Sequence, residues 1–368
     1  MSQTRLRFLV CAGLPALLAC GPTTDTGEPD TPELPGLTIE WFNEDHVTGG
    51  YLLIAFVSEP PAVALIDRHG EVLWARARAT GEDDILSTHA IAGPETGQVF
   101  FNLYTSLREG GSASSLHQIV ESSYLGGLSN TLAAPDLHHD FAVLPDGSLA
   151  WLAYDLRDTD DGPQRGDKLT ERAPDGSLQT VWSSWDHYDY ETAPQETASA
   201  SWSHANALRF DEARDEYQIG LRNYGHIVGV DRTTGEINWT FGEDGDFSLE
   251  HGGAFPTQQH HFHLYEDTLV LFDNGPREDL DSNAVAYALN WKAMSAREIW
   301  RFGSDPPLYS YGLGDADRLP NGNTLVTWSS LGQIDEVSPS GDVVWRLNTA
   351  LGAAIGYVDW LETLNLPD

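Results

Sequence analysis

The sequence predicts an all-β fold, a β-propeller of six blades, from three features of its pattern. From Leu37 onward, short apolar strands are separated by turn signals about every eight to twelve residues, and there is hardly any helical period. One hairpin phrase recurs along the chain, and a second phrase ends most units with a tryptophan. Tandem units long enough for four strands each are typical of propeller blades.

The recurring hairpin begins with a histidine that lies eight residues before a turn glycine in its first two copies. These copies read HAIAGPETG and HDFAVLPDG, and one copy with a longer turn and one with a shorter turn follow. The histidines that open the four copies are His89, His139, His204 and His260. A fifth copy, residues 314–322, has no histidine. Apolar runs joined by tight turns account for the hairpins, but they do not explain the histidines.

The phrase that closes the units is a turn, a glycine, a short strand and a tryptophan, with a looser copy at Trp300. The tryptophans are Trp74, Trp182, Trp239, Trp300 and Trp345. The last three intervals are 57, 61 and 45 residues, and the first, of 108, predicts a unit without its tryptophan. A β-sandwich or barrel is the alternative, although neither generates tandem self-similarity of this length. The final stretch, residues 354–364, would either close the ring or cover an edge.

The first twenty residues, 1–20, are typical of a secretory signal. Arg5 and Arg7 precede a short apolar run, residues 8–19, which cannot span a bilayer as a mature helix. The run leads into Leu-Leu-Ala-Cys, and Cys20 resembles the lipidated cysteine of a bacterial lipobox. We therefore expect a lipoprotein signal and a mature chain without a free thiol or a disulfide. A plain signal peptide with an incidental cysteine is the alternative.

Residues 21–36 are rich in Thr, Pro, Gly and acidic residues, so we expect a disordered tether before a propeller domain at residues 37–368. The formal charge of −36 becomes −38 when a leader with two arginines and no acidic residue is removed. Such a surface repels nucleic acid and anionic lipid. Nucleic acid is therefore not an expected partner, and the lipid on Cys20 is the only expected contact with a membrane.

The four hairpin histidines are predicted to face one another. In a propeller the innermost strand of each blade lines a central channel, so residues at one register of successive repeats form a ring. A single histidine there is ordinarily a hydrogen-bonded structural side chain, whereas four in register favour a functional site. Aligning HHFHLYED with HDFAVLPD selects His260, because His261 and His263 point the other way on an alternating strand.

Two more side chains are candidates for binding an anion. Arg222, in an otherwise apolar strand of an acidic chain, is either a salt-bridged structural residue or a fixed fork for a tetrahedral oxyanion. Asn206 follows His204 by two residues, so it shares a strand face and can donate to the same oxygen. His261 and His263 could be two ligands of a metal, but the sequence identifies no third ligand, so no metal site is predicted.

At these residues the chain resembles the bacterial arylsulfate sulfotransferases, or arylsulfotransferases, which are exported β-propellers. Five segments carry the resemblance in the family's order, among them WSHANAL and QHHFHLYEDTLVLFDNG. The segments are residues 138–147, 202–208, 219–242, 259–275 and 313–345. One departure concerns Asn283, which stands where the family often has an arginine, and it puts one anion contact in doubt.

In that family one histidine is transiently sulfated, and the other histidines and an arginine hold the sulfuryl group. The resemblance makes His260 the nucleophile and His139 an acid/base or stabilising partner. The residues it assigns to the sulfuryl oxygens are His204, Asn206 and Arg222. His89 matches no family motif, and its register alone makes it a candidate substrate-binding residue.

The resemblance implies a nucleotide-independent aryl sulfotransferase that moves a sulfuryl group from an aryl sulfate to a phenol through a sulfohistidine. No cofactor is expected, and no phosphate-cradling glycine loop is present in the sequence. The alternatives are a surface-anchored propeller that only binds partners and, less favoured, a quinoprotein dehydrogenase, since the paired cysteines common in those enzymes are absent. The expected location is that of an exported lipoprotein, periplasmic or anchored at the outer membrane or cell surface. The sequence indicates no oligomeric state.

Overall fold

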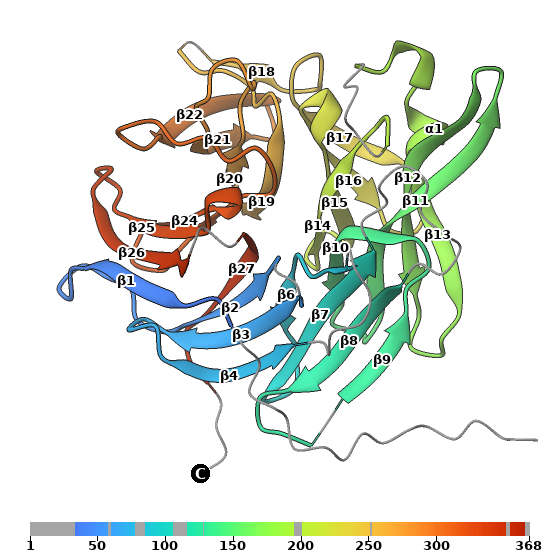
Figure 1. Ribbon diagram of the computed structural model, residues 1–368. Coiled ribbons are helices and arrows are strands. Elements are labelled where there is room, and N and C mark those ends of the chain that lie inside the picture. The colour runs from blue at the N-terminus through green and yellow to red at the C-terminus, as the bar shows by residue number, and fades with distance from the viewer. Residues whose placement is uncertain are drawn as a thin grey trace, which may run out of the picture. The chain divides into compact units, whose positions relative to one another are not determined.

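The computed structural model describes residues 34–57, 60–77, 85–105, 116–127, 129–194, 201–250, 252–350 and 354–364. These residues form six sheets of four or five strands each, which Figure 1 shows arranged around a common centre. The sheets are the blades of a six-bladed β-propeller, so the predicted fold class is confirmed. The predicted lipoprotein signal, its Cys20 and most of the predicted tether lie outside the described residues.

The strands of each blade run from the channel outward, and the first three blades are as follows. Blade 1 holds β27 (Ile355–Leu361), β2 (Tyr51–Phe56), β3 (Ala62–Asp67) and β4 (Val72–Ala77). Blade 2 holds β5 (Ile85–Leu86) and β6 (Ala90–Ala92), which both pair with β7 (Gln98–Thr105), and then β8 (His117–Ser123) and β9 (Ser129–Ala133). Blade 3 holds β10 (Leu137–Val143), β11 (Leu149–Thr159), β12 (Gly162–Arg172) and β13 (Leu178–Ser183).

The other three blades repeat this order. Blade 4 holds β14 (Ala205–Asp211), β15 (Glu216–Leu221), β16 (His226–Asp231) and β17 (Ile237–Phe241). Blade 5 holds β19 (Gln259–Tyr265), β20 (Thr268–Asp273), β21 (Asn283–Asn290), β22 (Ser295–Phe302) and the edge strand β18 (Ser248–Leu249). Blade 6 holds β23 (Asp315–Arg318), β24 (Thr324–Trp328), β25 (Gln333–Val337), β26 (Val343–Thr349) and the edge strand β1 (Leu37–Phe42). The short helices are α1 (Ser184–His187), η1 (Tyr190–Thr192), η2 (Arg222–Tyr224) and η3 (Ser329–Leu331).

The ring closes through both ends of the described chain. Strand β27 supplies the innermost strand of blade 1, where Val358 pairs with Ile54 of β2. Strand β1 adds an outer edge to blade 6, where Phe42 pairs with Trp345 of β26 (Figure 1). The final stretch of the sequence therefore closes the ring and does not cover an edge.

The recurring tryptophans mark the fourth strand of the blades. Those strands are β4, β13, β17, β22 and β26, and each carries one of the five predicted tryptophans. The fourth strand of blade 2, β9, reads SNTLA and has none. The long interval between Trp74 and Trp182 is thus a blade without its tryptophan, as the spacing predicted.

The hydrophobic core is divided among the six interfaces between consecutive blades. Each of the six apolar clusters draws its residues from two neighbouring blades. One of them joins Leu52 and Ile54 of blade 1 to Trp345 and Leu347 of blade 6, so the apolar packing continues across the point of closure. The apolar side chains are thus buried between blades, and polar side chains of the innermost strands line the channel.

Four innermost strands leave the regular ladder at one point, and in β27 the register against β2 shifts between Val358 and Ile355. The register of β10 against β11 shifts between Leu137 and Phe141, and that of β14 against β15 shifts between Ala205 and Ala207. The register of β19 against β20 shifts just after His260. Such bulges re-aim side chains, and here they decide which residues reach the channel. No helix among the described residues has the length and apolar character needed to cross a membrane.

Candidate active site

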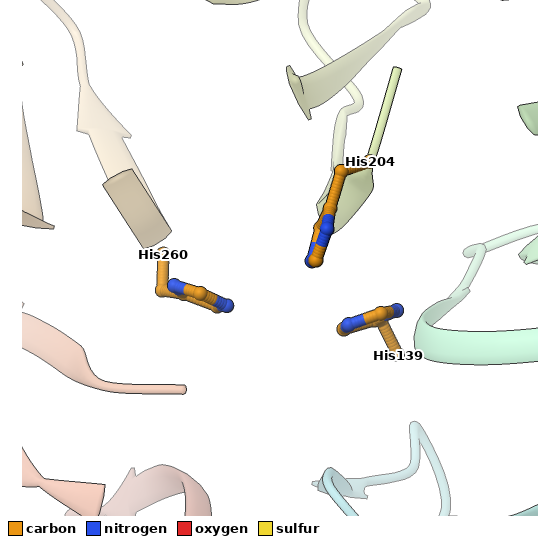
Figure 2. Close-up of side chains that lie close together, drawn as sticks. All are labelled: His139, His204 and His260. Atoms are coloured by element: carbon orange, nitrogen blue, oxygen red, sulfur yellow. The ribbon is translucent and has the colours of Figure 1, made fainter. Parts of the chain in front are cut away.

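Three of the four predicted histidines converge in the channel, as Figure 2 shows. His139 lies on β10, His204 directly precedes β14, and His260 lies on β19, so three consecutive blades contribute one ring each. The ring centroids of His139 and His204 are 5.1 Å apart, and those of His204 and His260 are 6.2 Å apart. One nitrogen from each ring lies within 4.8 Å of the other two. We call these residues the histidine trio.

The backbone at two members of the trio has a conformation that non-glycine residues seldom adopt. His139 has φ 50° and His204 has φ 49°, both in the left-handed region. The neighbouring blade holds the first of these turns, since the hydroxyl of Thr88 and the amide nitrogen of Asn102 both donate to the carbonyl oxygen of His139. Strained backbone that the surroundings hold in place is concentrated at functional sites.

The trio is uncharged at neutral pH and lies beside a cation. Burial, with smaller contributions that include Arg222, lowers the pKa of His139 to about 3. Burial also lowers the pKa of His204 and of His260 well below the usual value, and Arg222 adds to both shifts. The guanidinium is fixed by Gln258, whose Oε1 accepts from Nη2 at 2.7 Å. Three neutral imidazoles beside a fixed guanidinium form a group of side chains suited to binding an anion.

Asn274 determines which nitrogen of His260 is available for chemistry. The side-chain nitrogen of Asn274 donates to the carbonyl oxygens of Ser310 at 2.6 Å and Leu313 at 2.8 Å, which fixes the orientation of the amide. The amide oxygen therefore faces Nδ1 of His260 and accepts its proton. In the neutral ring, Nε2 then carries the lone pair, which is the state of a nucleophile or a base.

His139 is the end of a chain of buried polar groups. Its Nδ1 lies 2.9 Å from Nδ1 of His138, so one proton is shared between the two rings. Nε2 of His138 lies 3.1 Å from Oδ1 of Asp167, at ion-pair distance, and both side chains are fully buried or nearly so. Although burial raises the pKa of Asp167, hydrogen bonds and the nearby His138 lower it by more, so this carboxylate is ionised.

The same carboxylate also supports His204. Oδ2 of Asp167 accepts hydrogen bonds from the hydroxyls of Ser201 and Ser203 at 2.9 Å and 2.7 Å. It accepts a third, at 2.7 Å, from the backbone N–H of Ala205, which follows His204. The hydroxyl of Ser201 in turn accepts from the backbone N–H of His204 at 3.0 Å. One residue of β12 therefore positions two members of the trio.

The structure separates His89 from the trio and places it in a second layer of the channel. In five blades a buried residue lies directly before the point where the innermost strand begins regular pairing, and in blade 6 the buried residue is the first of the ladder. Each of these six residues is at most 2% exposed. These six residues are His89, Asp140, Asn206, His261, Asp315 and Tyr357. We call them the polar ring, since every blade contributes one member.

A difference in turn length explains the place of His89. The N–H of Gly93 donates to the carbonyl of Gln98, which leaves four residues in that turn. The equivalent bond in blade 3 joins Leu144 to Ser148 and leaves three. Counting back from the turn glycine aligns His89 with His139, whereas the ladder aligns it with Asp140. The extra residue therefore moves His89 by one position along its strand.

The polar ring fills the channel beside the trio. Nδ1 of His89 lies 2.6 Å from Asp140 Oδ1, and Nδ1 of His261 lies 2.7 Å from Asp315 Oδ1. The rings of His89 and His261, from blades 2 and 5, are 5.1 Å apart, and that of His261 stacks on Tyr357 at 4.1 Å. Contacts between opposite blades therefore fill the middle of the channel at this level.

Metal binding is less compatible with these residues than anion binding. The trio offers the three imidazole nitrogens that zinc accepts, but the guanidinium of Arg222 lies close enough to lower all three pKa values. Asp315 supplies the third donor that the sequence did not identify for His261 and His263. Arg209, however, donates to Nδ1 of His263 at 2.7 Å, so the proton of the neutral ring is on Nε2, which faces Asp315. That nitrogen has no lone pair for a metal.

The remaining predicted residue, Asn206, belongs to the polar ring. Its side-chain nitrogen donates to the carbonyl oxygen of Gln259 at 2.6 Å, directly before His260, so it also steadies β19. Sequence reasoning did not single out His138, Asp167 or Asn274. His138 and Asn274 lie within segments that carry the family resemblance, whereas no sequence signal marks Asp167.

Comparison with known families agrees with this geometry. The Arylsulfotransferase (ASST) family profile matches residues 43–353, which include the whole histidine trio and Arg222. The chain belongs to the arylsulfotransferase family. Membership supports aryl sulfotransferase activity in general and implies small-molecule aryl sulfates and phenols as substrates. A comparison with curated proteins gives no match.

Solved structures are similar in fold. A protein of unknown function from Bacteroides caccae has 13% identity and a TM-score of 0.54, and the match covers 85% of this chain and 100% of that one. A chain of a nidogen/laminin complex has 12% identity and a TM-score of 0.51, with 84% and 97% covered. At such identities the likeness concerns the propeller fold alone.

Proposed function

We propose that this protein is a nucleotide-independent aryl sulfotransferase that works through a sulfated His260. The observation that carries the proposal is the convergence of three neutral imidazoles beside a fixed guanidinium in a member of the arylsulfotransferase family. In the first half-reaction Nε2 of His260 attacks the sulfur of an aryl sulfate, and the S–O bond to the aryl group breaks. In the second, a phenol oxygen attacks the sulfohistidine and His260 is released.

The tautomer of His260 supports its role as the nucleophile. Asn274 holds the proton on Nδ1, so Nε2 presents its lone pair without a prior proton transfer. Burial keeps the pKa of this ring low, and it therefore stays unprotonated at neutral pH. Sulfuryl transfer spreads charge over the peripheral oxygens, and a guanidinium already in position stabilises that charge without reorganisation. We assign this role to Arg222 and His204.

A single nucleophile supports a ping-pong order, because His260 takes the sulfuryl group from the donor and passes it to the acceptor. The first phenol must then leave before the second attacks the sulfohistidine. His139, at the end of a buried polar chain, is the group available to exchange protons with both phenols.

A transfer assay with a chromogenic donor tests the proposal. The protein is incubated with 4-nitrophenyl sulfate and phenol, and both 4-nitrophenolate and phenyl sulfate are measured. We expect parallel lines in double-reciprocal plots at several phenol concentrations and no requirement for a nucleotide. Absence of transfer, together with no sulfate on His260, would favour a propeller that only binds partners.

We also propose that the protein is exported and lipidated at Cys20, in the periplasm or at the outer membrane or cell surface. The arginines, the short apolar run and the Leu-Leu-Ala-Cys ending support this location. Metabolic labelling with a fatty acid should mark the wild-type protein and not the Cys20→Ser variant. Equal labelling of both would contradict a lipid anchor at this residue.

A further inference from the structure

We infer that His138 and Asp167 store the proton that passes between the two phenols during a catalytic cycle. The inference rests on the proposed function and gives His139 two positioning partners that act through it. In this scheme His139 touches the substrate, His138 holds the proton, and Asp167 balances the charge on His138.

The distances place the three side chains in one continuous chain. Asp167 Oδ1 lies 3.1 Å from Nε2 of His138, and Nδ1 of His138 lies 2.9 Å from Nδ1 of His139. Two Nδ1 atoms at this distance share one proton, which can be covalently attached to either ring. When it is on His138, Nε2 of His139 carries a proton and can donate it. When it is on His139, Nε2 of that ring has the lone pair and can accept one.

The proton balance closes over the two half-reactions. In the proposed cycle both nitrogens of His138 start with a proton, with Nε2 beside the Asp167 carboxylate, and His139 starts neutral with its proton on Nε2. As the aryl S–O bond breaks, the leaving phenolate takes that proton and His138 passes its Nδ1 proton to Nδ1 of His139. When the acceptor phenol attacks sulfohistidine, its proton enters at Nε2 of His139 and the Nδ1 proton returns to His138. No net proton is gained or lost.

The surroundings of the chain favour placing the charge on His138 and not on His139. Asp167 is ionised and buried, and the ring of His138 stacks on Tyr154 at 4.1 Å. Arg222 acts on the other side, where it opposes a positive charge on His139. Asp140 and Asp167 attract a proton to His139 more weakly than burial and its positive neighbours repel it.

The test compares two sulfate donors whose leaving groups differ in their need for protonation. The 4-nitrophenolate ion leaves without protonation, whereas the phenolate ion from phenyl sulfate is a poor leaving group. We expect His138→Gln to form sulfo-His260 from 4-nitrophenyl sulfate within about threefold of the wild-type rate, because nucleophilic attack does not use the stored proton. With phenyl sulfate we expect a loss of about 10²-fold or more, the range of general acid catalysis. Rapid quenching and mass spectrometry of the His260 peptide measure both rates.

Two further variants separate proton storage from a structural role. Asp167→Asn keeps the shape of the side chain and removes the charge that balances His138, so it should show the same donor-dependent loss of rate. This variant replaces His138→Gln in the test if His138→Gln does not fold. His187→Gln, on α1 after blade 3, is the matched control and should leave both rates unchanged, since His187 packs against Trp182 away from the trio. Thermal unfolding of each variant verifies that it is folded.

The outcomes are distinguishable from a failure of the proposed function. If wild-type protein never sulfates His260, the proposed function fails before the relay is tested. If it does, a loss in folded His138→Gln that is the same for both donors, or no loss with either, would overturn the inference. A loss confined to the poor leaving group would support it.

Discussion

The histidine trio and the two histidines of the polar ring share one type of side chain at almost the same register, and their surroundings give them opposite roles. In the polar ring, His89 and His261 each place Nδ1 against a buried carboxylate, at 2.6 Å and 2.7 Å. In the trio, His260 faces an amide oxygen and has a guanidinium near its ring. The first arrangement holds the histidines against carboxylates, whereas the second pairs a histidine with a neutral amide beside a guanidinium.

The charge around the ring separates a structural histidine from a reactive one in this channel, with carboxylates in the polar ring and a guanidinium beside the trio. Carboxylates Asp140 and Asp315 keep low pKa values despite burial because His89 and His261 stabilise their charge. These pairs join neighbouring blades, and Asp140 also accepts from the backbone N–H of Leu208 in blade 4 at 2.6 Å. Substitutions in the trio should therefore affect turnover, and substitutions in the polar ring should affect stability.

The largest expected effect is on turnover in His260→Ala. Removing the nucleophile should lower kcat for sulfate transfer by roughly 10³-fold or more, because no neighbouring group can form the same intermediate. The release of 4-nitrophenolate measures this loss. The melting temperature should change by only a few degrees, since Nδ1 gives up a single hydrogen bond. Normal turnover in this variant would contradict a catalytic role for the histidine trio and a structural role for the polar ring.

Arg222→Lys should have the next largest effect. Lysine keeps the charge but loses the planar fork, so kcat should fall by about 10²-fold. Steady-state kinetics with 4-nitrophenyl sulfate measure this, with Arg214→Lys on the β14–β15 turn as the matched control, because that arginine pairs with Asp211 at the surface. Equal activity of both variants would show that a positive charge alone is sufficient.

His89→Ala should lower stability and leave turnover nearly unchanged. It leaves the fully buried Asp140 carboxylate without its ion-pair partner, so the free energy of unfolding should fall by about 3 kcal/mol. Urea denaturation measures the loss. The folded fraction should retain kcat within a few-fold, because His89 does not contact the trio through any described bond. A large loss of kcat with unchanged stability would show that His89 acts in the catalytic site and not as a structural member of the polar ring.

The smallest expected effect is a change in the pH dependence of stability. The folded pKa of His139, about 3, lies below the ordinary value of 6.5, so the unfolded chain binds a proton that the native chain does not. Stability is therefore complete above pH 6.5 and is lost as pH falls toward 3. His139→Gln should reduce this slope by at most about 1.4 kcal/mol per pH unit. Urea titrations at pH 7, 6 and 5 compare the two proteins, and identical slopes would contradict a buried neutral His139.

Much of the fold and part of the site could be predicted from the sequence because both repeat. Turn signals recur with each blade, and a closing tryptophan recurs in every blade except blade 2. The long interval between tryptophans still marks blade 2 as one of the repeats. His139 and His260 lie on equivalent strands just before a bulge, so their spacing predicted their convergence. His204 joined them through a similar hairpin with a longer turn.

The rest of the site depends on details that spacing alone does not contain. His89 was predicted to face the trio because its turn glycine is eight residues away, but one extra turn residue shifts it into the polar ring. Asp167 lies on the third strand of blade 3 and reaches the trio through His138 and Ser201, without a counterpart in other blades that would mark it. Such contacts arise from tertiary packing and not from the repeat.

The most direct test of the account is to locate the sulfuryl group in wild-type protein quenched during turnover. The protein is mixed with 4-nitrophenyl sulfate without an acceptor, quenched at alkaline pH to preserve the N–S bond, digested and sequenced by mass spectrometry. The account predicts one sulfuryl group on His260 and none on His261 or His263 of the same peptide, and its loss when phenol is added before quenching. A sulfuryl group on His139 or His204, or full turnover with no sulfated residue, would contradict it.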